Sequence, residues 1–271
     1  MHTKKIIFYL ILIVSIITLI YLGQIVYKDV NYKLKQENSE KSVYEFIENN
    51  SKDIFTIDKI TYFSSANATS NVNSNSSFNI TSLEQYTDIA IFINNHADEE
   101  FTLENTLKSV KLSNITFESK PSIGTPALFY KNINKFAKPE YDKNQEISDS
   151  IDFAISSEDE ISYETPTLYN NCANPITFTY VNSNIKENYT LTENISNISY
   201  DGSLLKKCNI TLNSLACEIS FVITIVNNLD ETFTCPLILQ IPLSAESSTV
   251  YDGSLILKQD VNYKFIKQNI N

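Results

Sequence analysis

The chain has 271 residues, which is enough for one large domain or two domains of ordinary size. All 21 of its basic residues are Lys, and 32 acidic residues outnumber them, so the formal net charge is -11. An acidic chain without Arg is unsuited to nucleic acid, and its 4 Gly form no phosphate-binding loop, which argues against nucleotide enzymes and cofactors.

An apolar segment near the N-terminus predicts a membrane anchor. Residues 6–22 carry no charge, and extension to residue 27 gives a helix of roughly 33 Å, enough to cross the lipid bilayer. We expect residues 6–27 to be an uncleaved signal anchor, because the apolar part of a cleaved signal peptide spans only about 7 to 15 residues.

Lys residues lie on both sides of this anchor, so charge alone does not decide its orientation. We expect residues 1–5 to form a cytoplasmic tip and the rest of the chain to be extracytoplasmic, since a first helix commonly acts as a signal anchor. The alternative is a cytoplasmic β region whose cysteines stay reduced.

Residues 28–52 lack Gly and Pro and mix apolar side chains with Lys, Glu and Gln. This composition predicts a short helical stalk that continues the anchor helix. A coiled-coil dimer is disfavoured, because the apolar residues are not sustained over three or four heptads.

From Asp53 onward, short apolar or alternating runs separated by Asn, Asp and Ser predict a mostly β fold. The clearest predicted strands are Asp88–Asn94, Thr106–Phe117, Ala127–Lys131, Ser150–Ser156, Pro175–Val181, Cys217–Asn227 and Phe233–Leu243. No amphipathic helix separates them, which favours antiparallel, immunoglobulin-like β-sandwiches over parallel sheets. The polar run Ser64–Asn79 is predicted to be an exposed, mobile loop.

An internal repeat suggests how this region is divided. Residues 89–102 (IAIFINNHADEEFT) resemble residues 221–234 (FVITIVNNLDETFT), as expected for one hairpin that occurs twice. Shorter echoes are YDGSLLKK at Tyr200 with YDGSLILK at Tyr251, and TPALFYKN at Thr125 with TPTLYNNC at Thr165. A duplication predicts two sandwich domains, residues 53–147 and 148–271; the alternative is one larger sandwich.

The four cysteines are Cys172, Cys208, Cys217 and Cys235, and none forms a CxxC pair. Their spacing does not match a structural zinc site. Disulfide bonds suit an exported domain, although the sequence cannot choose among three connectivities. Buried free thiols are the alternative, because Cys217 and Cys235 alternate with apolar residues in predicted strands.

Catalytic motifs are absent from the sequence. The segment ETFTC, ending at Cys235, resembles the Thr-x-Thr-Cys strand of the sortase transpeptidases, and the resemblance implies a Cys nucleophile with a His acid and an Arg oxyanion donor. The chain has no Arg, and its two His, His2 and His96, support neither this chemistry nor a Ser/His/Asp triad. We therefore expect a non-enzymatic surface protein that binds an envelope protein or glycan.

Several acidic and aromatic residues remain as candidates for other sites. Acidic clusters at 98–100, 158–160 and 230–231 lack the spacing of a Ca²⁺ loop and are expected to be solvated turns, so no metal or cofactor is predicted. The alternative to a binding protein is an enzyme with a carboxylate site, for which the candidates are Asp88, Asp152 and Glu160. Candidate sugar platforms are Tyr62, Tyr130 and Tyr169.

Overall fold

A computed structural model describes residues 53–72, 78–97, 100–191 and 198–268. The predicted cytoplasmic tip, the anchor at 6–27 and the stalk at 28–52 lie outside these residues. Within the part that is described, no helix is long and apolar enough to cross a membrane.

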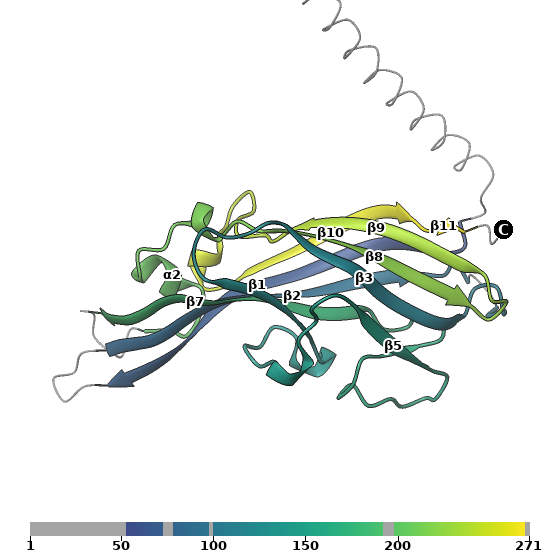
Figure 1. Ribbon diagram of the computed structural model, residues 1–271, viewed down its shortest axis with the longest axis horizontal. Helices are drawn as coiled ribbons and strands as arrows, with labels where there is room; N and C mark the ends of the chain where they lie inside the picture. The colour runs from purple at the N-terminus through teal and green to yellow at the C-terminus, as the bar shows by residue number, and fades with distance from the viewer. Residues whose placement is uncertain (1–52, 73–77, 98–99, 192–197, 269–271) are drawn as a thin grey trace, which may run out of the picture. The chain divides into compact units, whose positions relative to one another are not determined.

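The described residues form a mostly β fold, as the sequence predicts, and their strands are arranged in two sheets (Figure 1). The first, sheet A, has the strand order β10-β1-β2-β7-β4 and is antiparallel throughout. Its strands are β1 (Thr56–Val72), β2 (Phe78–Asn94), β4 (Thr125–Tyr130), β7 (Ile176–Leu191) and β10 (Leu255–Lys264).

The second sheet, sheet B, has the order β11-β9-β8-β3-β5-β6. Its strands are β3 (Leu107–Ser119), β5 (Ile151–Ser156), β6 (Thr167–Tyr169), β8 (Glu218–Asn227), β9 (Thr232–Gln240) and β11 (Ile266–Lys267). Pairing is antiparallel except between β5 and β6, which run parallel. All seven strands named from the sequence are present, and five of them have ends shifted by a few residues at most, whereas β2 begins well before and β7 ends well after its predicted bound.

Helices are short and lie in the connections between strands. They are η1 (Ile133–Lys135), η2 (Lys143–Gln145), α2 (Ser203–Lys207), η4 (Leu212–Leu215) and η5 (Val250–Asp252). The segment that contains η1 and η2, residues 131–146, connects β4 to β5 and is important for the site described below.

One apolar cluster joins the inner faces of the two sheets. Phe178 of β7 meets Phe221 of β8 edge to face, with ring centroids 5.7 Å apart, and Tyr130 of β4 meets Phe153 of β5 at 6.4 Å. Because successive strand side chains point to opposite faces, the alternate residues Ile176, Phe178 and Tyr180 of β7 contribute to this cluster.

A second cluster lies farther along sheet A, where β1, β2 and β7 are covered by α2 and its neighbouring connections. Ala66 and Ala68 of β1 are buried there against residues such as Leu204 and Leu205 of α2. The predicted mobile loop at Ser64–Asn79 is therefore wrong over most of its length, since β1 continues to Val72 and β2 begins at Phe78. The buried face of this strand carries small rather than large apolar side chains, because a helix packs on them.

The predicted division into domains 53–147 and 148–271 is replaced by one compact unit, Asp53–Asn271. Each sheet takes strands from both ranges, so neither range has a core of its own. The alternative of one larger unit matches this arrangement. Its physical basis is that β1 and β2 from the first range pair with β10 and β7 from the second, and that their apolar residues share clusters with residues of the second range.

The repeated hairpin occurs only once. β8 and β9 pair as expected, but β2 lies in sheet A while β3 lies in sheet B, so the described residues between 89 and 102 form no hairpin. The equivalent aromatic residues differ accordingly, because Phe233 is 2% exposed in the core and Phe101 is 56% exposed. The duplication thus finds no support in the pairing of the strands.

The two similar YDGSL segments, which begin at Tyr200 and Tyr251, lie against each other. The backbone N–H of Gly202 donates to the carbonyl of Gly253 over 2.6 Å, and the hydroxyl of Ser65 donates to the same carbonyl over 2.8 Å. A Cβ atom on Gly202 would lie 2.0 Å from the carbonyl oxygen of Val250, a distance that no side chain tolerates. Glycine is required at residue 202 by this close approach.

Candidate functional site

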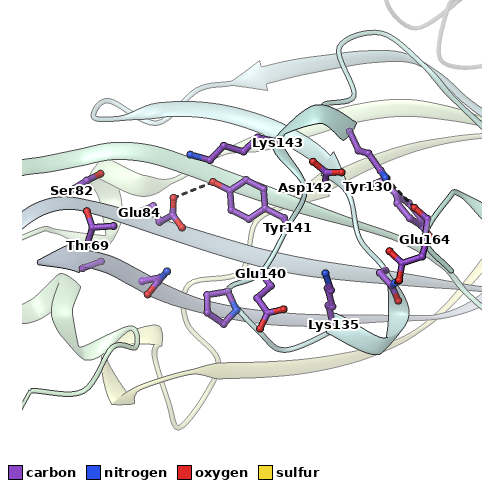
Figure 2. Close-up of a pocket in the computed structure, with 15 residues that line it drawn as sticks. Thr69, Ser82, Glu84, Tyr130, Lys135, Glu140, Tyr141, Asp142, Lys143 and Glu164 are labelled. Atoms are coloured by element: carbon purple, nitrogen blue, oxygen red, sulfur yellow. Dashed lines mark hydrogen bonds between the residues drawn. The ribbon is translucent and has the colours of Figure 1, made fainter.

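A groove of about 760 Å³ lies on the face of sheet A that points away from sheet B. Strands β1 and β2 form its floor, and residues 131–146 form one wall (Figure 2). The residues that line it are Asn67, Ala68, Thr69, Ser82, Glu84, Tyr130, Asn132, Lys135, Pro139, Glu140, Tyr141, Asp142, Lys143, Gln145 and Glu164. No such groove was predicted.

A buried ion pair holds the wall of the groove on the sheet. Nζ of Lys131 lies 3.2 Å from Oδ1 of Asp88, and their side chains are 1% and 0% exposed. Nζ also donates to the carbonyls of Lys138 at 2.6 Å and Glu140 at 2.8 Å, while the N–H of Ala137 donates to Oδ2 of Asp88 at 2.8 Å. Residues 137–140 are thereby attached to β2 through one lysine and one aspartate.

Burial moves both partners of this pair toward their neutral forms. Loss of water raises the pKa of Asp88 to about 6, although the charge of Lys131 acts in the opposite direction. Loss of water likewise lowers the pKa of Lys131, against the opposing charge of Asp88. The pair is inaccessible to a ligand, so we assign it to the support of the groove.

Two tyrosines line the groove, and Tyr141 supplies its accessible aromatic ring, because Tyr130 packs in the cluster between the sheets. The ring of Tyr141 packs on Phe129 with centroids 4.7 Å apart, and its hydroxyl donates to Oε2 of Glu84 over 3.1 Å, as Figure 2 shows. Tyr130 is almost buried, and its hydroxyl donates to the carbonyl of Tyr163 over 3.0 Å. Burial raises the pKa of Tyr130 to about 12, so this hydroxyl stays protonated.

The groove is polar and moderately acidic. Four carboxylates face two ammonium groups, namely Glu84, Glu140, Asp142 and Glu164 against Lys135 and Lys143. Carboxylates accept hydrogen bonds from hydroxyl and amino groups, and a tyrosine ring packs against apolar faces of a ligand. This lining suits a neutral or amine-bearing polar ligand and disfavours a polyanion.

Comparison with known proteins adds no family to this description. No family model, curated protein or solved structure matches the chain.

The structure separates the three carboxylates named from the sequence. Asp88 is the buried partner of Lys131 beneath the groove wall. Asp152 projects from β5 into solvent, 73% exposed and 3.4 Å from Lys111, and Glu160 is exposed between β5 and β6. Only Asp88 belongs to the neighbourhood of the groove, so the three do not form one carboxylate site.

The acidic clusters and the candidate tyrosines do not come together in one site either. Asp230 pairs with Lys108, and Glu231 pairs with Lys267 at 2.5 Å, while the described residues contain no group of acids, His and Cys arranged to hold a metal. Tyr62 is buried in the core, and the hydroxyl of Tyr169 donates to Asp159 outside the groove. Tyr130 alone among the three candidates lines the groove.

All four cysteines are free thiols in the structure. Cys208 lies in the cluster under α2, whereas Cys217 and Cys235 lie between the sheets. Cys235 pairs with Ile223 of β8, six residues along from Cys217, or roughly 20 Å, too far for a disulfide bond. Burial raises the pKa of Cys172 and Cys235 to about 12 and of Cys208 and Cys217 to about 11. Three of the four thiols are buried, and Cys172 is half-buried.

His96 does not complete a catalytic triad. Its Nε2 lies 2.9 Å from Oγ1 of Thr56, but that hydroxyl donates to Asp58 at 2.5 Å and is therefore turned away from the imidazole. A triad requires a His that accepts the proton of an accessible hydroxyl, and Thr56 is 3% exposed. The His stays an exposed turn residue, as the sequence indicated.

Proposed function

We propose that this chain is a single-pass membrane protein that presents an immunoglobulin-like β-sandwich outside the cytoplasm as a non-enzymatic binding module. The apolar segment at 6–27 supports the anchor, with residues 1–5 cytoplasmic and residues 28–52 as the stalk. Two largely antiparallel sheets around a shared core support the sandwich. The bilayer and a ligand of the cell envelope are then its partners.

The groove on sheet A is the observation that carries the binding function. It combines an aromatic ring, four carboxylates and several amides and hydroxyls in a space of about 760 Å³, within the usual size of a ligand site. Sugars present hydroxyl groups to such acceptors and C–H faces to tyrosine rings. We infer that the ligand is a neutral or amino-sugar oligosaccharide.

A glycan array probed with the full chain in detergent tests this function. The array carries neutral, amino-sugar and acidic oligosaccharides, and we expect binding to the first two classes. Tyr141→Ala and Glu84→Gln each remove a groove contact and should weaken binding by about tenfold, which corresponds to about 1.4 kcal/mol. The matched controls, Tyr263→Ala on β10 and Glu246→Gln in an exposed turn, should bind as the unmodified chain does. Equal binding by all four variants, or no binding to any glycan, would refute the proposal.

A membrane-anchored enzyme is the second candidate, favoured by the four carboxylates in one groove. Hydrolysis of a bound oligosaccharide requires an acid and a base or nucleophile among them. Incubation of bound glycans followed by mass analysis distinguishes the two, because a binding module returns them intact. An enzyme would cleave them and lose cleavage, but not binding, in one carboxylate-to-amide variant.

A further inference from the structure

The Asp88–Lys131 pair differs from an ordinary surface ion pair in its position across three strands and in its burial. It connects β2 to the end of β4 across the intervening β7, since Asp88 lies opposite Thr179 and the hydroxyl of Thr177 donates to the carbonyl of Lys131. Both side chains are almost fully excluded from water. Removal of two charges from water is costly, so this position favours a state in which neither residue is charged.

The hydrogen bonds around Lys131 determine where the lone pair of its neutral amine points. Two of its donors are directed to the carbonyls of Lys138 and Glu140. In the neutral amine these two carbonyls take both N–H groups, which leaves the lone pair directed toward Asp88, whose Oδ1 lies 3.2 Å from Nζ. Because Oδ1 is bonded to Cγ, this contact also brings Nζ close to the carbon that it would attack.

The carboxyl group of Asp88 is prepared in a complementary way. The N–H of Ala137 donates to Oδ2 at 2.8 Å, while Oδ1 has no hydrogen-bond partner. A donor fixed on one oxygen stabilises the negative charge that grows there when a nucleophile adds to the carbon. The other oxygen is free to depart.

We propose that Lys131 and Asp88 condense to an intramolecular isopeptide bond. Nζ of Lys131 attacks Cγ of Asp88, the new C–N bond forms, and the bond from Cγ to Oδ1 breaks. Of the three protons on the ammonium group, one stays on the amide nitrogen and two leave with Oδ1 as water. The reaction needs no oxidant or cofactor, and the dry surroundings oppose its reversal.

The burial of both groups assists this step. A raised pKa for Asp88 and a lowered pKa for Lys131 favour transfer of a proton from the amine to the carboxylate, which produces the reactive acid and amine. The resulting bond would tie the groove wall covalently to the centre of sheet A. This inference is independent of what the groove binds.

Digestion of the full chain with a protease that cleaves after Lys gives a direct test. Asp88 falls in the peptide 60–108, and cleavage after Lys131 separates peptides 121–131 and 132–135. An isopeptide blocks that cleavage, so we expect one branched product that joins 60–108 to 121–135 and is lighter than their sum by one water. Tandem mass spectrometry assigns the junction to Asp88 and Lys131.

Two controls make the result decisive. Lys131→Arg keeps the charge but should give no branched product, whereas Lys108→Arg at an exposed ion pair should leave the 88–131 junction intact in its enlarged peptide. Water loss at Asp201 or Asp252, each followed by Gly, would indicate succinimide formation and would contradict the proposal unless the branched product is also present. Free peptides 121–131 and 132–135 from a chain shown by circular dichroism to be folded would overturn it.

Discussion

At the scale of single residues, the positions least tolerant of substitution are those where polar side-chain atoms or backbone atoms are buried. Lys131 and Asp88 are invisible to sequence reasoning as a pair, because 43 positions separate them and neither occurs in a recognisable motif. Asp88 was a candidate only as a carboxylate in a strand. Its importance comes from the partner that residues 131–146 bring to it, which is a tertiary effect.

Gly202 offers a residue-scale prediction of stability. Gly202→Ala places a methyl group 2.0 Å from the carbonyl oxygen of Val250, so the backbone of α2 or η5 must move. We expect the free energy of unfolding to fall by more than about 2 kcal/mol, as overpacking of a rigid site usually costs. Denaturant titration of the full chain measures it, and Ser247→Ala in an exposed turn should change nothing. A Gly202→Ala variant as stable as the original chain would show that the backbone around Val250 moves to accept the methyl group at little cost.

At the scale of elements, the sequence predicted strands well where apolar residues alternate and poorly where small or polar residues do so. β8 and β9 follow the expected pattern, and β1 was missed because its buried face includes Ala66 and Ala68 rather than large side chains. Their burial depends on α2, a five-residue helix too short to predict from its own period. The groove was missed for a related reason, since its wall is formed by irregular backbone with no periodic pattern.

The turn between β8 and β9 gives a prediction about pH. Hydrogen bonds from Lys267 of β11 and from Asn227 lower the pKa of Glu231 below its ordinary value of 4.5. A lowered folded pKa stabilises the chain above the unfolded pKa, and this stability is lost as the pH falls through the folded value. Glu231→Gln should therefore make the unfolding free energy less dependent on pH below about 4.5. Denaturant curves across this range test it, with Glu246→Gln as the control that keeps the original slope.

At the scale of the whole molecule, the two apolar clusters share β1, β2 and β7, so we expect them to unfold together. Sequence reasoning placed a domain boundary at residue 147 because local echoes resemble a duplication, and the fold class could be predicted without the order of the strands. Strand order depends on contacts between distant segments, which a pattern of short runs does not contain.

The buried thiols report this cooperativity. Cys208 lies in one cluster and Cys235 in the other, 0% and 2% exposed. Pulsed labelling with a thiol reagent, followed by peptide mapping, should show both thiols becoming reactive at one denaturant midpoint, because a two-state unit opens as a whole. Half-buried Cys172 should react earlier by local opening. Two separate midpoints for Cys208 and Cys235 would restore the division into independent domains.

The return of residues 146–147 to β4 also bears on how the molecule stays separate from its neighbours. Glu146 bridges to Phe129, and the N–H of Ile147 donates to the carbonyl of Leu128 over 2.8 Å, which occupies the free side of this edge strand. An uncovered edge would offer its donors and acceptors to the strand of another molecule and promote aggregation. The segment that walls the groove therefore also shields the sheet against growth by strand addition on that side.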